Sequence, residues 1–186
     1  MIDALIRWQI ARFERRFGYD ASDLKQLLAM SRRAFLGFTR AGRLAEARGD
    51  VPPAAWYAAR IVALRAEDCG PCTQLAVDMG LAAGVPPAVL AAALCDCEDE
   101  LDRLDAAAAL GWRYAHAVVD RRADIAPLGE ALRRRWGDRG LAALAVGIAA
   151  ARMYPMLKYA LGHAQACQRV QVAGLTLPPS PSTHAH

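Results

Sequence analysis

Residues 66–88 read AEDCGPCTQLAVDMGLAAGVPPA, with two cysteines three positions apart at the start of an apolar run. Pro71 lacks a backbone N–H and is best tolerated in the first turn of a helix, where that donor has no partner. Gly84, followed by Val85 and a proline pair, is typical of the residue that ends a helix. The stretch therefore predicts a helix that is opened by the Cys69-Gly70-Pro71-Cys72 motif and runs to about Ala83.

Apolar residues at helical spacing continue on both sides of this stretch. We expect a first helix stopped by Gly18, a second capped by Asp20 or Ser22, and no strand anywhere. Further helical or apolar segments are expected at 35–44, 54–66, 88–94, 102–119, 127–137 and 141–170, with an acidic connector at 95–100 and a kink at Pro155. The fold class is therefore all-α, with one domain over 1–176 and a disordered tail over 177–186, which is rich in Pro, Ser and Thr.

The composition agrees with a helical protein and argues against a nucleic-acid binder. Of 186 residues, 55% are hydrophobic and only 7% aromatic, and much of the apolar content is alanine, the best helix former. The net charge is +4, and nearly all the positive charge is arginine, in clusters interleaved with Glu and Asp. No aromatic stacking platform accompanies these clusters, so we interpret them as solvated helix faces and expect no nucleic-acid partner.

The N-terminal segment has charges where a signal peptide would need an apolar core. The longest apolar run, 141–151, is too short to span a bilayer. We therefore expect a soluble, cytoplasmic protein with no membrane partner. Because thiols are kept mostly reduced in the cytoplasm, a Cys-x-x-Cys pair there indicates redox chemistry or metal binding, not a structural staple.

The placement of the pair suits redox chemistry. A helix N-terminus favours a thiolate, since unpaired N–H groups and the positive end of the helix dipole lie there. Cys69 and Cys72 lie on one face of the first turn, within reach of a disulfide. The alternative is that they are two small buried apolar residues. Cys-Gly-Pro-Cys also occurs in thioredoxin, but there a strand precedes it, whereas residues 54–66 here predict a helix.

Residues 54–94, with the Cys-Gly-Pro-Cys motif, Gly80 and Gly84, resemble the alkylhydroperoxidase D-like (AhpD-like) branch of the carboxymuconolactone decarboxylase family. The resemblance implies an all-α fold, usually a homo-oligomer, that acts as a thiol peroxidase or disulfide reductase without metal or organic cofactor. It implies a peroxide or disulfide substrate and a protein or small-thiol electron donor. It also makes Cys72 the attacking thiolate and Cys69 the resolving residue, whereas the helix-terminus argument alone equally favours Cys69.

Two helper positions of the family pattern differ. Its histidine four residues after the second cysteine is Ala76 here, and its glutamate about twelve residues before the first is Tyr57. Candidate replacements for proton transfer are Glu67 or Asp68, beside the pair, and His116 as a more distant base, with His163 behind it. Each also has an ordinary alternative, as a helix-terminal acid or a core histidine. Glu67 and His116 are the candidates we carry forward as catalytic.

Three cysteines lie outside the motif. If the helices on either side of Gly84 pack antiparallel, Cys95 and Cys97 return toward the motif. They would then supply an auxiliary dithiol or complete a four-thiolate zinc site, or they have no joint role. Cys167 is expected to be structural. The alternative to an enzyme is a non-catalytic family member, either a structural zinc–thiolate protein or a redox-sensing helical interaction module.

Overall fold

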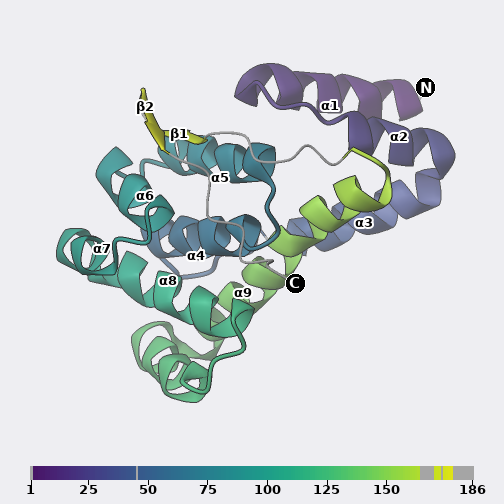
Figure 1. Ribbon diagram of the computed structural model, residues 1–186. Helices are drawn as coiled ribbons and strands as arrows, with labels where there is room; N and C mark the ends of the chain where they lie inside the picture. The colour runs from purple at the N-terminus through teal and green to yellow at the C-terminus, as the bar shows by residue number, and fades with distance from the viewer. Residues whose placement is uncertain (1, 45, 164–169, 173, 178–186) are drawn as a thin grey trace, which may run out of the picture.

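The computed structural model describes residues 2–44, 46–163, 170–172 and 174–177. This part of the chain is mostly helical, as the sequence predicted, and most of the expected helices are present (Figure 1). The helices are α1 (Ile2–Phe17), α2 (Ser22–Met30), α3 (Arg32–Leu44), α4 (Pro53–Arg65), α5 (Gly70–Ala82), α6 (Pro87–Leu94), α7 (Glu98–Leu104), α8 (Ala106–Val119) and α9 (Ile125–Ala160).

Helix α4 is the centre of the main body and packs against α5, α6, α8 and α9. Its closest neighbour is α8, because Gly111 lets the two backbones touch: a Cβ at Gly111 would lie 2.5 Å from the carbonyl oxygen of Ala55. Both helices are rich in buried alanine, for example Ala55, Ala59 and Ala108. Small side chains at this interface let the helices approach closely, which explains much of the alanine excess in the composition.

Helices α1, α2 and α3 form a separate layer, which Figure 1 shows on the side of the body nearest the N-terminus. The layer has its own small core, made of Ile10, Ala21, Leu28 and Phe35. It touches the main body mainly where α1 meets α5 and where α3 meets α9. The described part of the chain therefore has two cores, and the space between them borders the Cys-x-x-Cys helix.

The helix boundaries after residue 94 differ from the prediction. The acidic connector expected at 95–100 is only partly a connector, because Glu98 opens the short helix α7. The next helix does not begin at Asp102. Asp105 caps α8 instead, its side chain accepting hydrogen bonds from the backbone N–H groups of Ala107 and Ala108 at 2.8 and 2.9 Å. A carboxylate at this position satisfies two donors that the helix leaves open.

The last helical region agrees with the prediction in part. The expected boundary between the 127–137 and 141–170 helices is confirmed, because α9 consists of two helices joined across a kink at Gly137, whose φ of 67° is outside the helical range. Pro155 lies within α9, where the residue with non-helical backbone angles is Gly137, so the marked kink of this element lies at Gly137 and not at Pro155, where we expected one. The helix ends at Ala160, not near residue 170.

A short β-hairpin follows, which the sequence did not predict. Strand β1 (Val170–Val172) pairs antiparallel with β2 (Leu175–Leu177), and Gly174, with a φ of 86°, lies in the turn. In β1 the side chains of Val170 and Val172 are buried and β1 packs on α5. Three-residue strands are too short to show the alternation by which a sequence reveals a strand. The rest of the expected tail, 178–186, and Cys167 lie outside the described residues.

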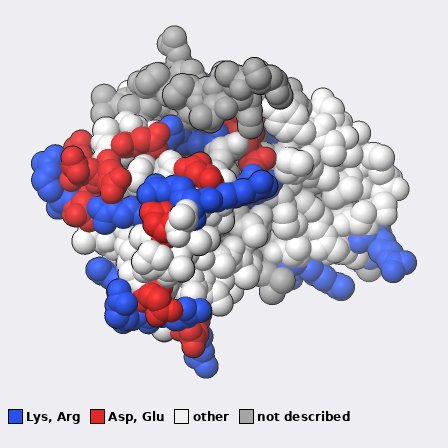
Figure 2. Space-filling view, turned by 60° about the horizontal axis from the view of Figure 1, so that its bottom comes forward, with Lys and Arg blue, Asp and Glu red and all other residues white. Residues whose placement is uncertain are grey.

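Within the described residues, α9 is the one helix long and apolar enough to cross a membrane by length and composition. Of its most apolar window, 44% is buried against the rest of the protein, as in a core helix of a globular domain, so this is weak evidence for a span. On the face in Figure 2, basic and acidic side chains lie side by side. Ion pairs such as Arg113 with Glu98 and Arg122 with Asp124 show the same mixing.

Candidate functional site

The Cys-x-x-Cys motif opens α5, as the sequence predicted. Cys69 is the N-cap residue, with φ and ψ of −103° and 88°, and Cys72 lies in the first helical turn. The two form a disulfide, with their Cα atoms 5.3 Å apart. Both are buried, Cys69 with 7% of its surface exposed and Cys72 with 3%. The positive end of the dipole of a thirteen-residue helix therefore lies at the cysteine pair. Because both cysteines are buried, a reactant can reach them only through a cavity.

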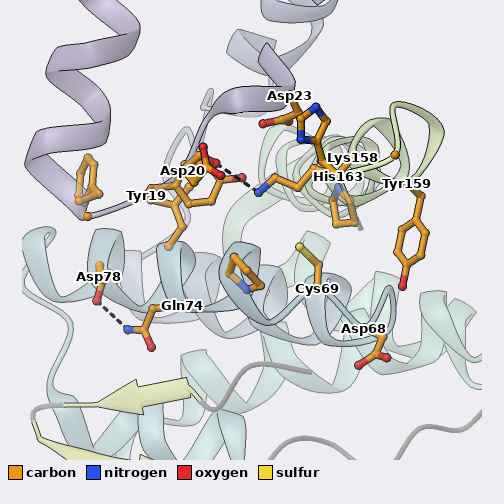
Figure 3. A pocket seen from close by; sticks show the side chains of 16 residues that line it. Tyr19, Asp20, Asp23, Asp68, Cys69, Gln74, Asp78, Lys158, Tyr159 and His163 are labelled. Carbon is orange, nitrogen blue, oxygen red and sulfur yellow. Dashed lines mark hydrogen bonds between the residues drawn. The ribbon is translucent and has the colours of Figure 1, made fainter. Parts of the chain in front are cut away.

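Cys69 borders a polar cavity of about 500 Å³ between the α1–α2 connection, α5 and the end of α9. Figure 3 shows the Cys69 sulfur pointing to the side from which Lys158, His163 and Asp23 enter. Asp20 and Tyr19 lie on the same side of α5, whereas Asp68, Gln74 and Asp78 point away from it. The polar lining is Tyr19, Asp20, Asp23, Asp68, Gln74, Asp78, Lys158, Tyr159 and His163. Charged and proton-bearing groups thus gather around one sulfur of the pair.

Cys72 borders a different cavity, of about 910 Å³, between the α1–α3 layer and the main body. Its lining is largely apolar and aromatic, including Ile10, Phe13, Phe35, Leu36, Trp56 and Tyr154, with Arg60 among the few charged groups. Ala76 and Tyr57, the two positions at which the chain departs from the AhpD-like pattern, both lie in this wall. The two positions at which the family pattern places a polar relay are therefore an alanine and a tyrosine in the wall of this cavity.

Tyr19 lines both cavities and brings a polar group to Cys72. Its hydroxyl oxygen lies 3.8 Å from the Cys72 Sγ atom. Burial, together with the nearby Asp23 and Asp20 carboxylates, raises the pKa of Tyr19 well above its ordinary value, so the phenol keeps its proton at neutral pH. Tyr19 can therefore donate a hydrogen bond to a Cys72 thiolate but does not act as a base.

Lys158 brings a buried positive charge to the same point. Its side chain is 8% exposed, and its Nζ atom lies 4.3 Å from the centre of the Tyr19 ring, within the range of a cation–π contact. The ammonium group also donates a hydrogen bond to the Asp20 carbonyl oxygen at 3.4 Å. Burial lowers the pKa of Lys158, and the Asp23 and Asp20 carboxylates partly oppose this shift. The amine therefore gives up a proton more readily than an exposed lysine.

Asp23 completes the group and is 1% exposed. In the part of the chain that the structure describes, its Oδ1 atom has no hydrogen-bond partner. Burial raises the pKa of Asp23, with Lys158 acting in the opposite direction. His163 lines the same cavity and hydrogen-bonds through Nε2 to Gln26. A buried carboxyl, an amine and a phenol thus adjoin the disulfide, and together they form a set that can hold and pass protons.

Glu67 and His116, the two residues predicted to assist the cysteine pair, line neither of these cavities. Glu67 is engaged in an ion pair with Arg152 and lines neither cavity. His116, on α8, lies 3.5 Å from Asp96 and 3.4 Å from Asp120, and its ring packs at a tilt against Trp112. It too is absent from both cavity linings. These contacts place His116 beside the Cys95–Cys97 segment instead.

Three groups of the site were not singled out from the sequence: Tyr19, Asp23 and Lys158. Of these, only Lys158 could have been noticed in the sequence. It is one of two lysines in a chain that otherwise uses arginine, and it lies in an apolar helical segment. Tyr19 and Asp23 read as ordinary residues of a helix connection and a first helical turn.

No three metal-ligating side chains converge among the described residues. Cys95 and Cys97 form a disulfide with each other and do not join Cys69 and Cys72, so the four-thiolate zinc arrangement is wrong for this conformation. Comparison of the chain with protein-family models, with curated proteins and with solved structures gives no match. The family resemblance rests on the motif residues alone.

Proposed function

We propose that this protein is a thiol-dependent oxidoreductase of the AhpD-like type that reduces peroxides through the Cys69–Cys72 pair. One observation carries the proposal. The disulfide at the start of α5 has each sulfur at a different cavity, with the Tyr19 hydroxyl 3.8 Å from Cys72. This arrangement supports Cys72 as the attacking residue and Cys69 as the resolving one.

In the first step the Cys72 thiolate attacks the terminal oxygen of a hydroperoxide, R–O–OH. The O–O bond breaks, Cys72 becomes a sulfenic acid, and the alkoxide leaves as the alcohol after taking one proton. The thiolate is favoured by the α5 N-terminus, the Tyr19 hydroxyl and the Lys158 charge. The lowered pKa of Lys158 suits it to supply the proton, and the buried Asp23 carboxyl is suited to return one.

In the second step the Cys69 thiol attacks the Cys72 sulfenic acid, which forms the disulfide and releases water. Two thiols of an electron donor then reduce this disulfide, and the donor becomes a disulfide in turn. The sum is R–OOH plus two donor thiols giving R–OH, water and one donor disulfide. The polar cavity gives the donor a route to Cys69 that does not pass through the apolar cavity at Cys72.

The size and lining of the Cys72 cavity favour an apolar organic hydroperoxide over hydrogen peroxide. A volume of about 910 Å³ is in the range of sites for small organic ligands. Burial of an apolar substrate group contributes about 25 cal/mol per Å² of apolar surface. The proposal includes a cytoplasmic location, a protein or small-thiol donor, a homo-oligomer and no organic cofactor.

Peroxide consumption with a general dithiol donor tests the proposal. We expect turnover by the wild type, none by Cys72→Ser, and a single turnover by Cys69→Ser that leaves a sulfenic acid on Cys72 for dimedone to trap. Cys167→Ser is the matched control, because it removes a cysteine outside the pair, and it should turn over like the wild type. An apolar hydroperoxide should give a higher kcat/KM than hydrogen peroxide.

Equal peroxide consumption by the wild type and Cys72→Ser would contradict the proposal. A reversible Cys69–Cys72 disulfide without peroxide turnover would instead support a redox-sensing helical module.

A further inference from the structure

A second cysteine pair lies away from both cavities, between α6 and α7. Cys95 is the C-cap of α6 and Cys97 the N-cap of α7, and the two form a disulfide with their Cα atoms 5.3 Å apart. Cys95 is exposed and Cys97 is half-buried. In contrast to the buried Cys69–Cys72 pair, this disulfide can be reached directly from solvent.

A structural role does not explain this disulfide well. A cross-link stabilises a fold mainly by restricting the unfolded chain, and the restriction grows with the length of the closed loop. The loop here contains a single residue, Asp96, so it restricts the unfolded chain very little. The disulfide also joins the ends of two helices that are already consecutive in the chain. Its accessibility and small constraint are both typical of a disulfide that opens and closes.

The Cys95–Cys97 disulfide closes a ring of three residues, and Asp96, the residue between the cysteines, is held in place by side chains from two other helices. Asp96 has a left-handed backbone, with a φ of 56°, which is uncommon for a residue other than glycine. The end of α4 contributes Arg65, which donates to both carboxylate oxygens of Asp96 at 2.6 and 2.9 Å. On α8, His116 lies 3.5 Å from the same carboxylate. The three-residue ring thus presents one carboxylate to α4 and α8 at once.

We propose that Cys95–Cys97 is a second redox site of this protein, a solvent-facing disulfide that exchanges with external thiols. A donor thiolate attacks the Cys95 sulfur, the exposed one, and forms a mixed disulfide while the Cys97 thiolate leaves and takes a proton. A second donor thiol then releases Cys95 as a thiol. Two donor thiols are oxidised to one disulfide, and two electrons and two protons pass to the Cys95–Cys97 pair.

The surrounding charge selects the donor. Four exposed carboxylates follow or lie within the ring, namely Asp96, Glu98, Asp99 and Glu100. Arg65 pairs with Asp96, and Arg113 pairs with Glu98 and Asp102, so the negative charge that these cations do not balance comes from Asp99 and Glu100. An approaching thiol with a carboxylate is repelled and one with an amine is attracted, and salt screens both effects. The site therefore takes a small thiol that carries a positive charge.

Opening of the ring has a local consequence that can be observed. Reduction frees Asp96 to leave its left-handed conformation, which loosens its contacts with Arg65 and His116. The His116 ring packs at a tilt against Trp112, with centroids 4.0 Å apart. The Trp112 indole N–H donates to the carbonyl of Ala93, two residues before Cys95, at 3.2 Å. The indole N–H signal of Trp112 is therefore a direct reporter of the state of the second pair.

The test uses a Cys69→Ser/Cys72→Ser/Cys167→Ser chain, which retains only the second pair. We expect it to form an intramolecular disulfide in a mildly oxidising thiol–disulfide buffer, and reduction to restore two alkylatable thiols per chain. At equal thiolate concentration, cysteamine should reduce it several-fold faster than mercaptoacetate. This ratio should fall toward one at high salt and in a Glu98→Gln/Glu100→Gln background. The Trp112 indole signal, assigned with Trp112→Phe, should move with the redox state.

If the triple variant does not fold, the wild type replaces it. The alkylated thiols at Cys95 and Cys97 are then counted in peptides from its oxidised and reduced forms. The proposal is overturned if Cys95 and Cys97 stay as two free thiols throughout the titration, or if the disulfide resists small thiols. Equal rates with cysteamine and mercaptoacetate would overturn the donor class. None of these outcomes depends on peroxide turnover at Cys72, so the two proposals stand or fall separately.

Discussion

The hydroxyl oxygen of Tyr19 lies 3.8 Å from the Sγ atom of Cys72, although the two residues are 53 positions apart in the sequence. Tyr19 belongs to the short connection between α1 and α2, and it lines the cavity of each sulfur. It also carries the Lys158 ammonium above its ring. A single side chain therefore links the cysteine pair to the buried charges around it.

Substitution Tyr19→Phe removes the hydrogen bond to Cys72 and keeps the ring. A hydrogen bond to a charged group contributes about 1.5 kcal/mol, which corresponds to roughly one pKa unit. We expect the pKa of the Cys72 thiol to rise by about one unit and peroxide reduction to slow about tenfold at neutral pH. The pH dependence of Cys72 alkylation in a Cys69→Ser background measures the first effect. Tyr114→Phe, at a buried tyrosine on α8, is the control, and equal behaviour of both variants would count against the role of Tyr19.

Replacement of Lys158 separates charge from packing. Lys158→Met keeps the length of the side chain and removes a buried charge, whose desolvation is unfavourable. We expect the free energy of unfolding to remain within about 1 kcal/mol of the wild type, while peroxide reduction falls several-fold. Lys25→Met, at a lysine on α2 that pairs with Glu14, should leave turnover unchanged. A Lys158→Met protein with full activity would remove Lys158 from the mechanism.

The buried carboxyl of Asp23 should make the fold less stable as the pH rises. Burial raises its pKa, so the folded state binds the proton more tightly than the unfolded state and loses stability once the carboxyl ionises. Asp23→Asn should therefore stabilise the protein by about 1 kcal/mol at pH 8 and by less at pH 4. Urea unfolding at both values measures this difference. Asp99→Asn, at an exposed position, should show no such trend, and a larger gain at pH 4 than at pH 8 would contradict the prediction.

The carboxylate of Asp96 should make the fold less stable as the pH falls, which is the opposite of the effect of Asp23. Although burial alone would raise its pKa, the contact with His116 and the hydrogen bonds from Arg65 lower it to about 2. Its stabilising contribution is therefore present above the unfolded pKa, near 3.9, and is lost as the pH falls toward 2. We expect Asp96→Asn to cost about 1 kcal/mol at pH 7, since the 43% exposed side chain is partly screened by solvent, and almost nothing at pH 2. Acid unfolding compared with Asp138→Asn, whose carboxylate is 90% exposed, measures the difference.

Local signals in the sequence predicted much of the fold. The start of α5 at the motif and the stop at Gly84 follow from a proline and a glycine in positions that only those residues fill well. Boundaries that depend on packing were missed. Asp102 and Asp105 are both suitable caps, and Asp105 is the one used because Leu101 is fully buried within α7. The end of α9 and the hairpin depend likewise on what they pack against.

The candidate site was predictable only where its residues are neighbours in the chain. The spacing of Cys69 and Cys72 identified the pair, since the first turn of a helix fixes their separation. Lys158 and Asp20 make contact across 138 positions, and no periodicity contains that information. Periodicity placed His116 in an apolar helix but did not determine which neighbours its face meets. The long-range contacts of the α1–α3 layer decide which polar groups reach the sulfurs.

That layer has its own small core, Ile10, Ala21, Leu28 and Phe35, separate from the core around α4. Regions with few shared apolar contacts open at a lower free energy than the whole protein. Amide hydrogen exchange should therefore show α1–α3 as a less protected cooperative unit than α4 and α8. For a bulky protein donor, the rate of reaction with the cysteine pair then depends on how often this unit detaches, and a mutation at Leu28, which lines neither cavity, can change it without touching the site.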